Sequence, residues 1–200
     1  MKTSPFVLSL FVLSILGTLT LAAQAAPNDG ITGAYARVEV GQSHFSLSST
    51  LPQVGADDHG QAVKVFGGYR FSDRVGVEAG YAALGSFNEN VGVSATVGGA
   101  SVKQDGKARS IFGAATGRLP LGESFALHGR LGVSSGKVSG ANVLPASDNL
   151  MGSKTSVLFG VGAEYRPKPN VALTVNYDSY GKLSNRVKAS AVVVGLHFTL

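Results

Sequence analysis

Apolar and polar residues alternate along most of the chain, which is the pattern of a β-strand with two different faces. In residues 63–71 the odd positions hold Val, Val, Gly, Tyr and Phe, whereas Lys64 and Arg70 lie among the even positions. The same alternation begins again at Ala34, Val75, Phe125, Val157, Val171 and Ala191. One more candidate, residues 107–119, alternates poorly, so its register stays open.

These segments number about eight, and each spans about ten residues, the length that a tilted transmembrane strand needs. The connections between them alternate in length. Short turns are expected at 72–74, 120–123 and 166–170, longer Gly-, Ser- and Asn-rich loops at 45–60, 86–106 and 136–153, and a short outer connection at 182–186. The pattern predicts an all-β fold, an eight-stranded antiparallel up-and-down transmembrane β-barrel with short periplasmic turns and longer external loops.

The N-terminus has the pattern of an export signal. Lys2 precedes an apolar run over residues 6–21, and Ala23-Gln24-Ala25 supplies the small residues that signal peptidase reads. A membrane helix is the alternative, but the run is at the lower limit of about 17 residues for a span. We therefore expect a signal peptide over 1–25, a barrel domain over 26–200, and a location in the outer membrane of a Gram-negative cell.

Composition distinguishes a membrane barrel from a soluble one. Charged residues are 14% of the chain, below the quarter or so that is usual for soluble domains, while hydrophobic residues are 44%. The more polar strand face is rich in glycine and carries a set of charges of mixed sign: Arg37, Glu39, Lys64, Arg70, Glu78, Arg130, Glu164 and Asp178. Because buried charges must be paired, a balanced set favours a narrow lumen, with the apolar face turned to lipid. A soluble barrel with an apolar ligand pocket is the alternative.

Aromatic residues are expected at one border of the membrane. Five of them stand near strand ends beside the short turns, where they would form a girdle: Tyr69, Phe71, Phe125, Tyr165 and Phe198.

Residues 69–81, 119–132 and 160–165 resemble three hairpins of the OmpA-like transmembrane domain and, less distinctly, its OmpX-like cousins. The resemblance implies a lumen plugged by ion pairs and an alternating last strand that the barrel assembly machinery recognises. That strand ends in Leu200 where the family has an aromatic residue, with Phe198 two positions earlier. We expect no peptidoglycan-binding domain, because the chain ends at this strand.

The function that these features predict is structural. The barrel would be an anchor that supports envelope integrity, displays loops, and binds membrane lipid and lipopolysaccharide as a monomer. The net charge is +5, and seven basic residues near the external strand ends would contact lipopolysaccharide phosphates: Lys103, Lys107, Arg109, Lys137, Lys154, Arg186 and Lys188. No nucleic-acid partner is expected, since the export signal directs the chain elsewhere.

Two alternatives stay open, a narrow passive channel and a lipid-modifying barrel enzyme. Eight strands leave a lumen only wide enough for side chains, which disfavours conduction. His44-Phe45-Ser46 resembles the His-x-Ser pair of barrel lipid A deacylases, but it lies near the first loop rather than late in the chain, and no acidic partner is evident. Asp57-Asp58-His59 is interpreted as a polar loop, because three adjacent residues do not build a metal shell. The sequence therefore predicts no catalytic residue, cofactor or metal.

Overall fold

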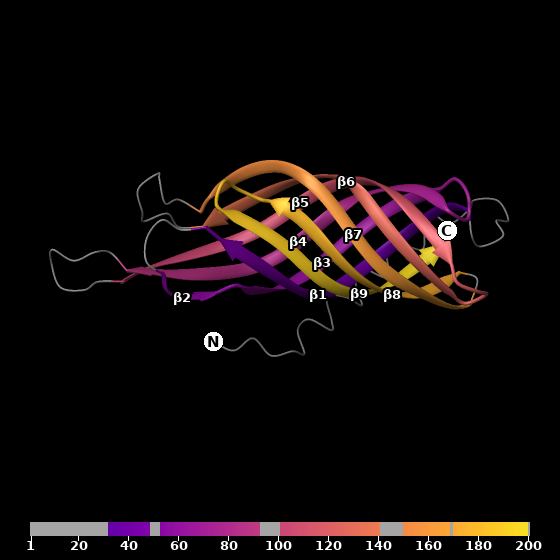
Figure 1. Ribbon diagram of the computed structural model, residues 1–200, viewed down its shortest axis with the longest axis horizontal. Coiled ribbons are helices and arrows are strands. Elements are labelled where there is room, and N and C mark those ends of the chain that lie inside the picture. Colours follow the sequence, from indigo (N-terminus) through magenta and orange to yellow (C-terminus); the bar gives the residue numbers. More distant parts are fainter. Residues whose placement is uncertain (1–31, 49–52, 93–100, 141–149, 169, 200) are drawn as a thin grey trace, which may run out of the picture.

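The computed structural model describes residues 32–48, 53–92, 101–140, 150–168 and 170–199, and side chains 53–57, 89–92 and 101–104 fall outside the description. The predicted signal peptide, residues 1–25, and Leu200 also lie outside it. The strands are β1 (Gly33–Leu47), β2 (Gln53–Asp57), β3 (His59–Arg70), β4 (Val75–Gly92), β5 (Ser101–Pro120), β6 (Phe125–Gly140), β7 (Gly152–Lys168), β8 (Val171–Lys182) and β9 (Val187–Thr199) (Figure 1).

The strands close into a barrel. Strand β1 pairs with both β3 and β9, and β4 pairs with β5, so the antiparallel ladder runs round the whole ring. Strands β2 and β3 pair in succession with the same neighbour, β4, and therefore share one place in the wall. The result is the predicted eight-stranded antiparallel barrel. Apart from the short β2, which pairs with β4 alone, ring closure leaves no open edge, which is what a strand protein needs in order to cross a lipid bilayer.

The two ends of the barrel differ. The start of β1 and the end of β9 lie at the end where short turns join β3 to β4, β5 to β6 and β7 to β8. We call this the turn end and the opposite end the loop end. In outer-membrane barrels the short turns are periplasmic, so we expect the loop end to face outside.

The strands extend further toward the loop end than the alternation predicted. Strand β4 continues to Gly92 and β5 begins at Ser101, so most of the loop expected over 86–106 is strand. The expected loops 45–60 and 136–153 are shortened in the same way. Beyond the membrane the outer face meets water and is polar, while buried apolar residues such as Phe45, Phe87 and Val138 face inward, so the sense of the alternation is reversed there. The open register of β5 is set by pairing of Ala115 with Val77 and Leu131.

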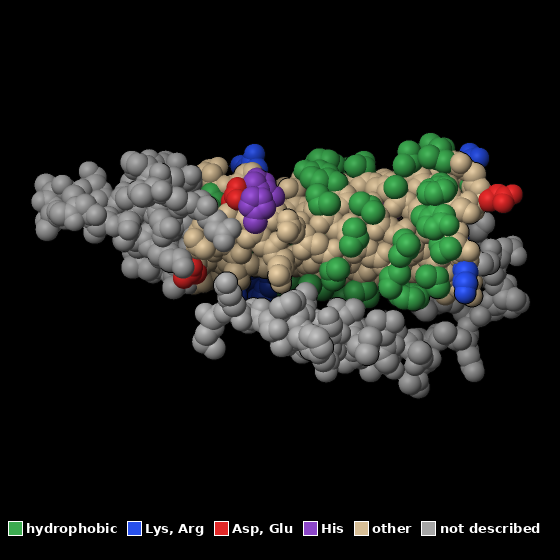
Figure 2. Space-filling view, turned by 90° about the horizontal axis from the view of Figure 1, so that it is seen from below, with side chains coloured by type: hydrophobic (Ala, Val, Ile, Leu, Met, Phe, Trp, Pro, Cys, Tyr) green, Lys and Arg blue, Asp and Glu red, His purple; other side chains and the backbone are tan. Residues whose placement is uncertain are grey.

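The two faces of the wall are inverted relative to a soluble protein. Leu131 on the outer face is 64% exposed, whereas Lys64 on the lumenal face is 2% exposed. Figure 2 shows outer apolar side chains gathered on the visible face of the barrel, over the part nearer the turn end. We call these outer apolar residues the apolar belt; it includes Val65, Val77, Ile111, Leu131, Val133, Val157, Val161, Leu173, Val175, Val192 and Val194. No helix of the described residues is long and apolar enough to cross a membrane.

Aromatic side chains border the belt at the turn end. Tyr69 and Phe71 are exposed there with ring centroids 5.4 Å apart, and Phe125 and Tyr165 form a second exposed pair at 4.8 Å. Amphipathic rings favour the membrane–water interface, so this end sits at one border of the bilayer.

Ring closure predicts resistance to detergent. Because every strand of the ring except the short β2 is paired on both sides, opening any seam must break a long ladder at once. We expect the folded mature chain to migrate as a compact species on a denaturing gel when unboiled, and to shift on boiling. Identical migration of both samples would contradict a closed barrel.

Candidate functional site

The lumen holds a dense set of charged side chains. All eight residues of the predicted lumenal set are buried, four of them cationic and four anionic: Arg37, Glu39, Lys64, Arg70, Glu78, Arg130, Glu164 and Asp178. They come from six different strands, so no short stretch of sequence contains the arrangement.

Five of these residues form what we call the central network. Lys64 Nζ lies 3.1 Å from Glu39 Oε2, its register partner on β1, and 2.7 Å from Asp178 Oδ2 on β8. Arg130 NH1 lies 3.1 Å from Glu78 Oε1, and its Nε lies 3.4 Å from Asp178 Oδ1. Each cation therefore bridges two carboxylates, which offsets the cost of removing all five charges from water.

The network requires a glycine in the wall. Gly160 on β7 is the register partner of Arg130 on one side and of Asp178 on the other. A Cβ at Gly160 would come within 2.2 Å of Asp178 Oδ1 and 2.9 Å of Arg130 Cγ. The missing side chain leaves the space through which these two residues meet.

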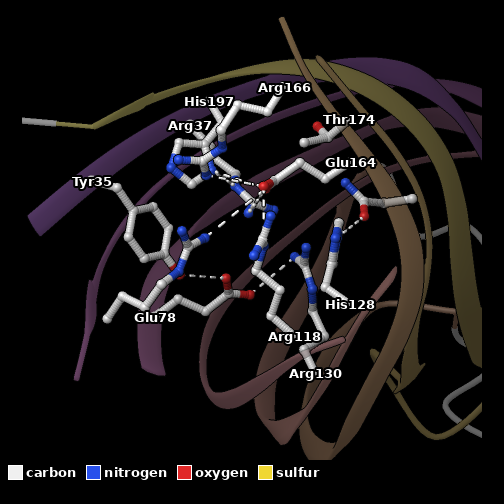
Figure 3. Close-up of polar contacts among 12 residues, drawn as sticks. Tyr35, Arg37, Glu78, Arg118, His128, Arg130, Glu164, Arg166, Thr174 and His197 are labelled. Atoms are coloured by element: carbon white, nitrogen blue, oxygen red, sulfur yellow. Dashed lines mark hydrogen bonds and ion pairs between the residues drawn. The ribbon is translucent and has the colours of Figure 1, made fainter. Parts of the chain in front are cut away.

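Nearer the turn end, one carboxylate gathers several cations, as Figure 3 shows. We call this group the Glu164 hub. The Glu164 oxygens lie near five nitrogens: Arg166 NH2 at 3.0 Å, Arg37 NH2 and Arg118 Nε each at 3.2 Å, His197 Nδ1 at 3.4 Å and Arg70 NH2 at 3.9 Å. The hub thus combines four guanidinium groups with one carboxylate, while anions outnumber cations in the central network.

Three hub members were not among the predicted site residues. The alternation already places His197 on the lumenal face with Val193, and extending the pattern of β7 by two residues from Glu164 would have placed Arg166 there too. Arg118 lies on β5, where the alternation is poor and no such signal exists.

Apolar side chains fill the lumen toward the loop end. Phe45 and Phe87 are buried with ring centroids 4.6 Å apart, and Phe112 lies between Phe66, at 5.8 Å, and Tyr180, at 6.5 Å. At the turn end, a cavity beside Tyr35 and the hub has a volume of only about 10 Å³. That is about the space of one water molecule.

The predicted lipopolysaccharide contacts separate into distinct groups. Lys107, Arg109 and Lys137 are exposed on the outer face of β5 and β6, and Arg109 and Lys137 are register partners. Lys188 is exposed on β9 opposite Lys182, a basic residue outside the predicted set.

The remaining predicted contacts are placed differently. Lys154 is half-buried, and its ammonium donates to Asn185 Oδ1 at 3.3 Å. Arg186 is half-buried and donates from NH1 to the Ser48 carbonyl at 2.8 Å. These two therefore have partners at the rim, and the side chain of Lys103 lies outside the described residues.

Comparison with known proteins agrees with this architecture. The model of the outer membrane protein beta-barrel domain family matches residues 11–199. Among solved structures, OprG from Pseudomonas aeruginosa is 14% identical, with 86% of this chain and 98% of that chain covered and a TM-score of 0.58. Neisserial surface protein A is 20% identical, with 84% of this chain and 98% of that chain covered and a TM-score of 0.55. Ail from Yersinia pestis is 22% identical, with 84% of this chain and 98% of that chain covered and a TM-score of 0.52. At these identities the likeness shows a shared fold. No curated protein sequence matches the chain.

The hub predicts a large effect of one neutral substitution. In Glu164→Gln, four guanidinium groups lose the carboxylate that they share, and buried cations remain without compensation. We expect the free energy of unfolding in lipid vesicles to fall by about 3–5 kcal/mol, which is the usual cost of breaking a buried ion pair by removing one partner. Urea titration followed by circular dichroism measures this. Glu123→Gln, in the exposed turn between β5 and β6, is the matched control; equal stability of both variants would contradict the role of the hub.

The space at Gly160 predicts a contrast between two glycines. Gly160→Ala should lower the free energy of unfolding by about 1–3 kcal/mol, because the added methyl group displaces the paired Arg130 and Asp178 side chains. Gly113→Ala on the outer face should be tolerated, since its Cβ would meet nothing within 4 Å. The same urea titration applies to both, and a loss in Gly113→Ala as large as in Gly160→Ala would point to backbone effects instead.

Proposed function

The chain belongs to the outer membrane protein β-barrel domain family, and on that premise we propose that it is a closed membrane anchor whose outer wall binds the phosphates of lipopolysaccharide. The filled lumen supports an anchor over a channel, because the central network and the Glu164 hub occupy the path that solutes would take.

The observation that carries the proposal is a pair of like charges. Arg109 and Lys137 are directly opposite one another on neighbouring strands, both exposed on the outer face. Such partners have Cβ atoms about 5 Å apart, and like charges at this distance destabilise a sheet. Within the described part of the chain, no carboxylate lies within 4 Å of either side chain. An external anion between them would remove the repulsion.

The level of the pair in the membrane identifies the anion. Toward the loop end of β5, Arg109 is the next outward-facing residue after the exposed Ile111. On β6, Lys137 is the second outward-facing residue beyond Val133 in the same direction. The pair therefore lies at the loop-end border of the apolar belt, where phosphates of the outer leaflet are expected. Phosphate accepts charge-assisted hydrogen bonds from guanidinium and ammonium groups.

The wall around the pair is grooved, and polar side chains lie among the residues that line the grooves. A groove of about 520 Å³ is lined by residues that include Tyr81, Ser86, Lys107, Arg109 and Ser139. A second groove of about 310 Å³ is lined by residues that include Tyr81, Arg109, Ser135, Lys137 and Ser153. Hydroxyl groups and a second ammonium group thus surround the pair, which suits a sugar phosphate.

A second like-charged pair supports the same role on the far side of the ring. Lys182 and Lys188 are register partners on β8 and β9, and both are exposed. Lipid surrounds a barrel, so phosphate contacts at more than one point of the border are expected.

The test compares one double variant with a matched one. In Arg109→Gln/Lys137→Gln we expect at least about tenfold weaker binding of lipopolysaccharide to the detergent-folded barrel, from the loss of two charge-assisted contacts. Without lipopolysaccharide, the variant should be more stable than the parent by about 0.2–1 kcal/mol, because the repulsion is gone. The control, Arg74→Gln/Lys168→Gln, removes the same charge from the turn end and should leave binding unchanged.

Two further probes distinguish the source of the anion. Dephosphorylated lipopolysaccharide should bind parent and variant equally weakly. Ail, which shares the fold, has been solved with the heparin analogue sucrose octasulfate; preference of this chain for that probe over lipopolysaccharide would overturn the proposal in favour of sulfated saccharides. Equal loss of binding in both double variants would show an effect of net charge alone.

A further inference from the structure

We propose that His44, Asp58 and His59 form a binding site for a divalent transition-metal ion of the Zn²⁺ class on the outer surface of the barrel. The site lies apart from the lumen and from the Arg109–Lys137 pair that carries the proposed function, and its test does not depend on that function.

Strand register brings the two histidines together. His44 on β1 and His59 on β3 are register partners at the last position of that ladder. Both side chains are on the outer face, 50% and 62% exposed, and their ring centroids are 5.0 Å apart. The sequence interpretation of a polar loop missed this pairing, because His44 is 15 positions from His59 and lies outside the Asp-Asp-His run.

Asp58 supplies the third donor. Its Oδ2 lies 3.5 Å from His44 Nδ1, and its Oδ1 lies 2.6 Å from His59 Nδ1. One ligand atom from each of the three residues lies within 4.8 Å of the others. Ligands around a tetrahedral zinc ion are roughly 3.3 Å apart, as follows from metal–ligand bonds of about 2.0 Å. The His44–Asp58 separation already suits this geometry, and rotation of exposed side chains brings in the third.

The backbone beneath these donors is held in place. The Phe45 amide donates to the Asp58 carbonyl at 2.7 Å, which joins the residue after His44 to the residue before His59. Phe45 itself is buried against Phe87. Two donors on a strand ladder, and a third whose backbone carbonyl is hydrogen-bonded to that ladder, lose less backbone freedom on binding a metal than donors on a loop would.

The donor set selects the class of ion. Two imidazoles and one carboxylate suit zinc and its neighbours, whereas Ca²⁺ and Mg²⁺ prefer oxygen ligands. Three protein ligands leave at least one coordination position open to water or an outside ligand. The site is also accessible to ions in water, because it lies beyond the apolar part of the wall. His44 is four residues past the outward-facing Val40 of β1 toward the loop end, about 13 Å along the strand. Figure 2 shows histidine side chains beside an acidic one beyond the apolar belt.

The composition of the chain makes the test clean. It has no cysteine and four histidines. The other two, His128 and His197, point into the lumen and contact Asn176 and Arg37 respectively. External metal therefore has few competing nitrogen or sulfur ligands, provided that no histidine tag is present.

Calorimetric titration of Zn²⁺ into the untagged mature chain, folded in detergent, tests the site. We expect one ion per barrel, at least about tenfold weaker binding in His44→Gln, His59→Gln and Asp58→Asn, and no displacement by excess Ca²⁺. Gln61→Ala, on the outer face of β3 next to the site, should bind as the parent does. Gel mobility confirms that each variant is folded.

A second readout separates the site from adventitious binding. Co²⁺ in place of Zn²⁺ should give the strong visible absorption of a low-coordinate nitrogen and oxygen site, and His44→Gln should abolish it. Absence of Zn²⁺ binding by the parent, or equal binding by the parent and all three ligand variants, would overturn the proposal.

Discussion

A strand protein in lipid must satisfy every backbone amide and carbonyl from within the sheet, and the remaining features of this chain depend on that constraint. The ladder closes where β1 meets β9, and closure gives each residue one of two environments. An outward residue meets lipid or water, and an inward residue meets the far wall of a narrow ring. Both the polar interior and the apolar exterior follow from this geometry.

Narrowness makes the lumenal charges interdependent. Each cation of the central network contacts two carboxylates, because opposite sides of the barrel wall are close enough for side chains to meet across the lumen. Gly160 leaves the space through which Arg130 reaches Asp178. The charges are not evenly distributed along the axis. Anions exceed cations in the central network, and cations exceed anions around Glu164. The two groups are therefore stabilised by each other as well as by their own pairs.

The same rigid wall organises the outer surface. Register places Arg109 opposite Lys137 and His44 opposite His59, and neither arrangement can relax by a shift of one strand. A slip by one residue would turn every belt residue of that strand into the lumen. The apolar belt thus fixes the register that keeps the two basic side chains opposite one another and the two imidazoles close together. These held groups are suited to bind what lipid and solvent offer, a phosphate in one case and a metal ion in the other.

Alternation of side chains by itself determined the fold class and which face each charged residue of the predicted lumenal set occupies, because a period of two is a local property of any extended strand. It did not determine the strand ends beyond the membrane, where the apolar face turns inward, or the register of β5 and the place of Arg118, where the alternation is poor. The partners of Glu164, the gap at Gly160 and the meeting of His44 with Asp58 and His59 were decided only by the tertiary structure. Each depends on which residues of distant strands stand opposite one another, and that follows from closure of the whole ring.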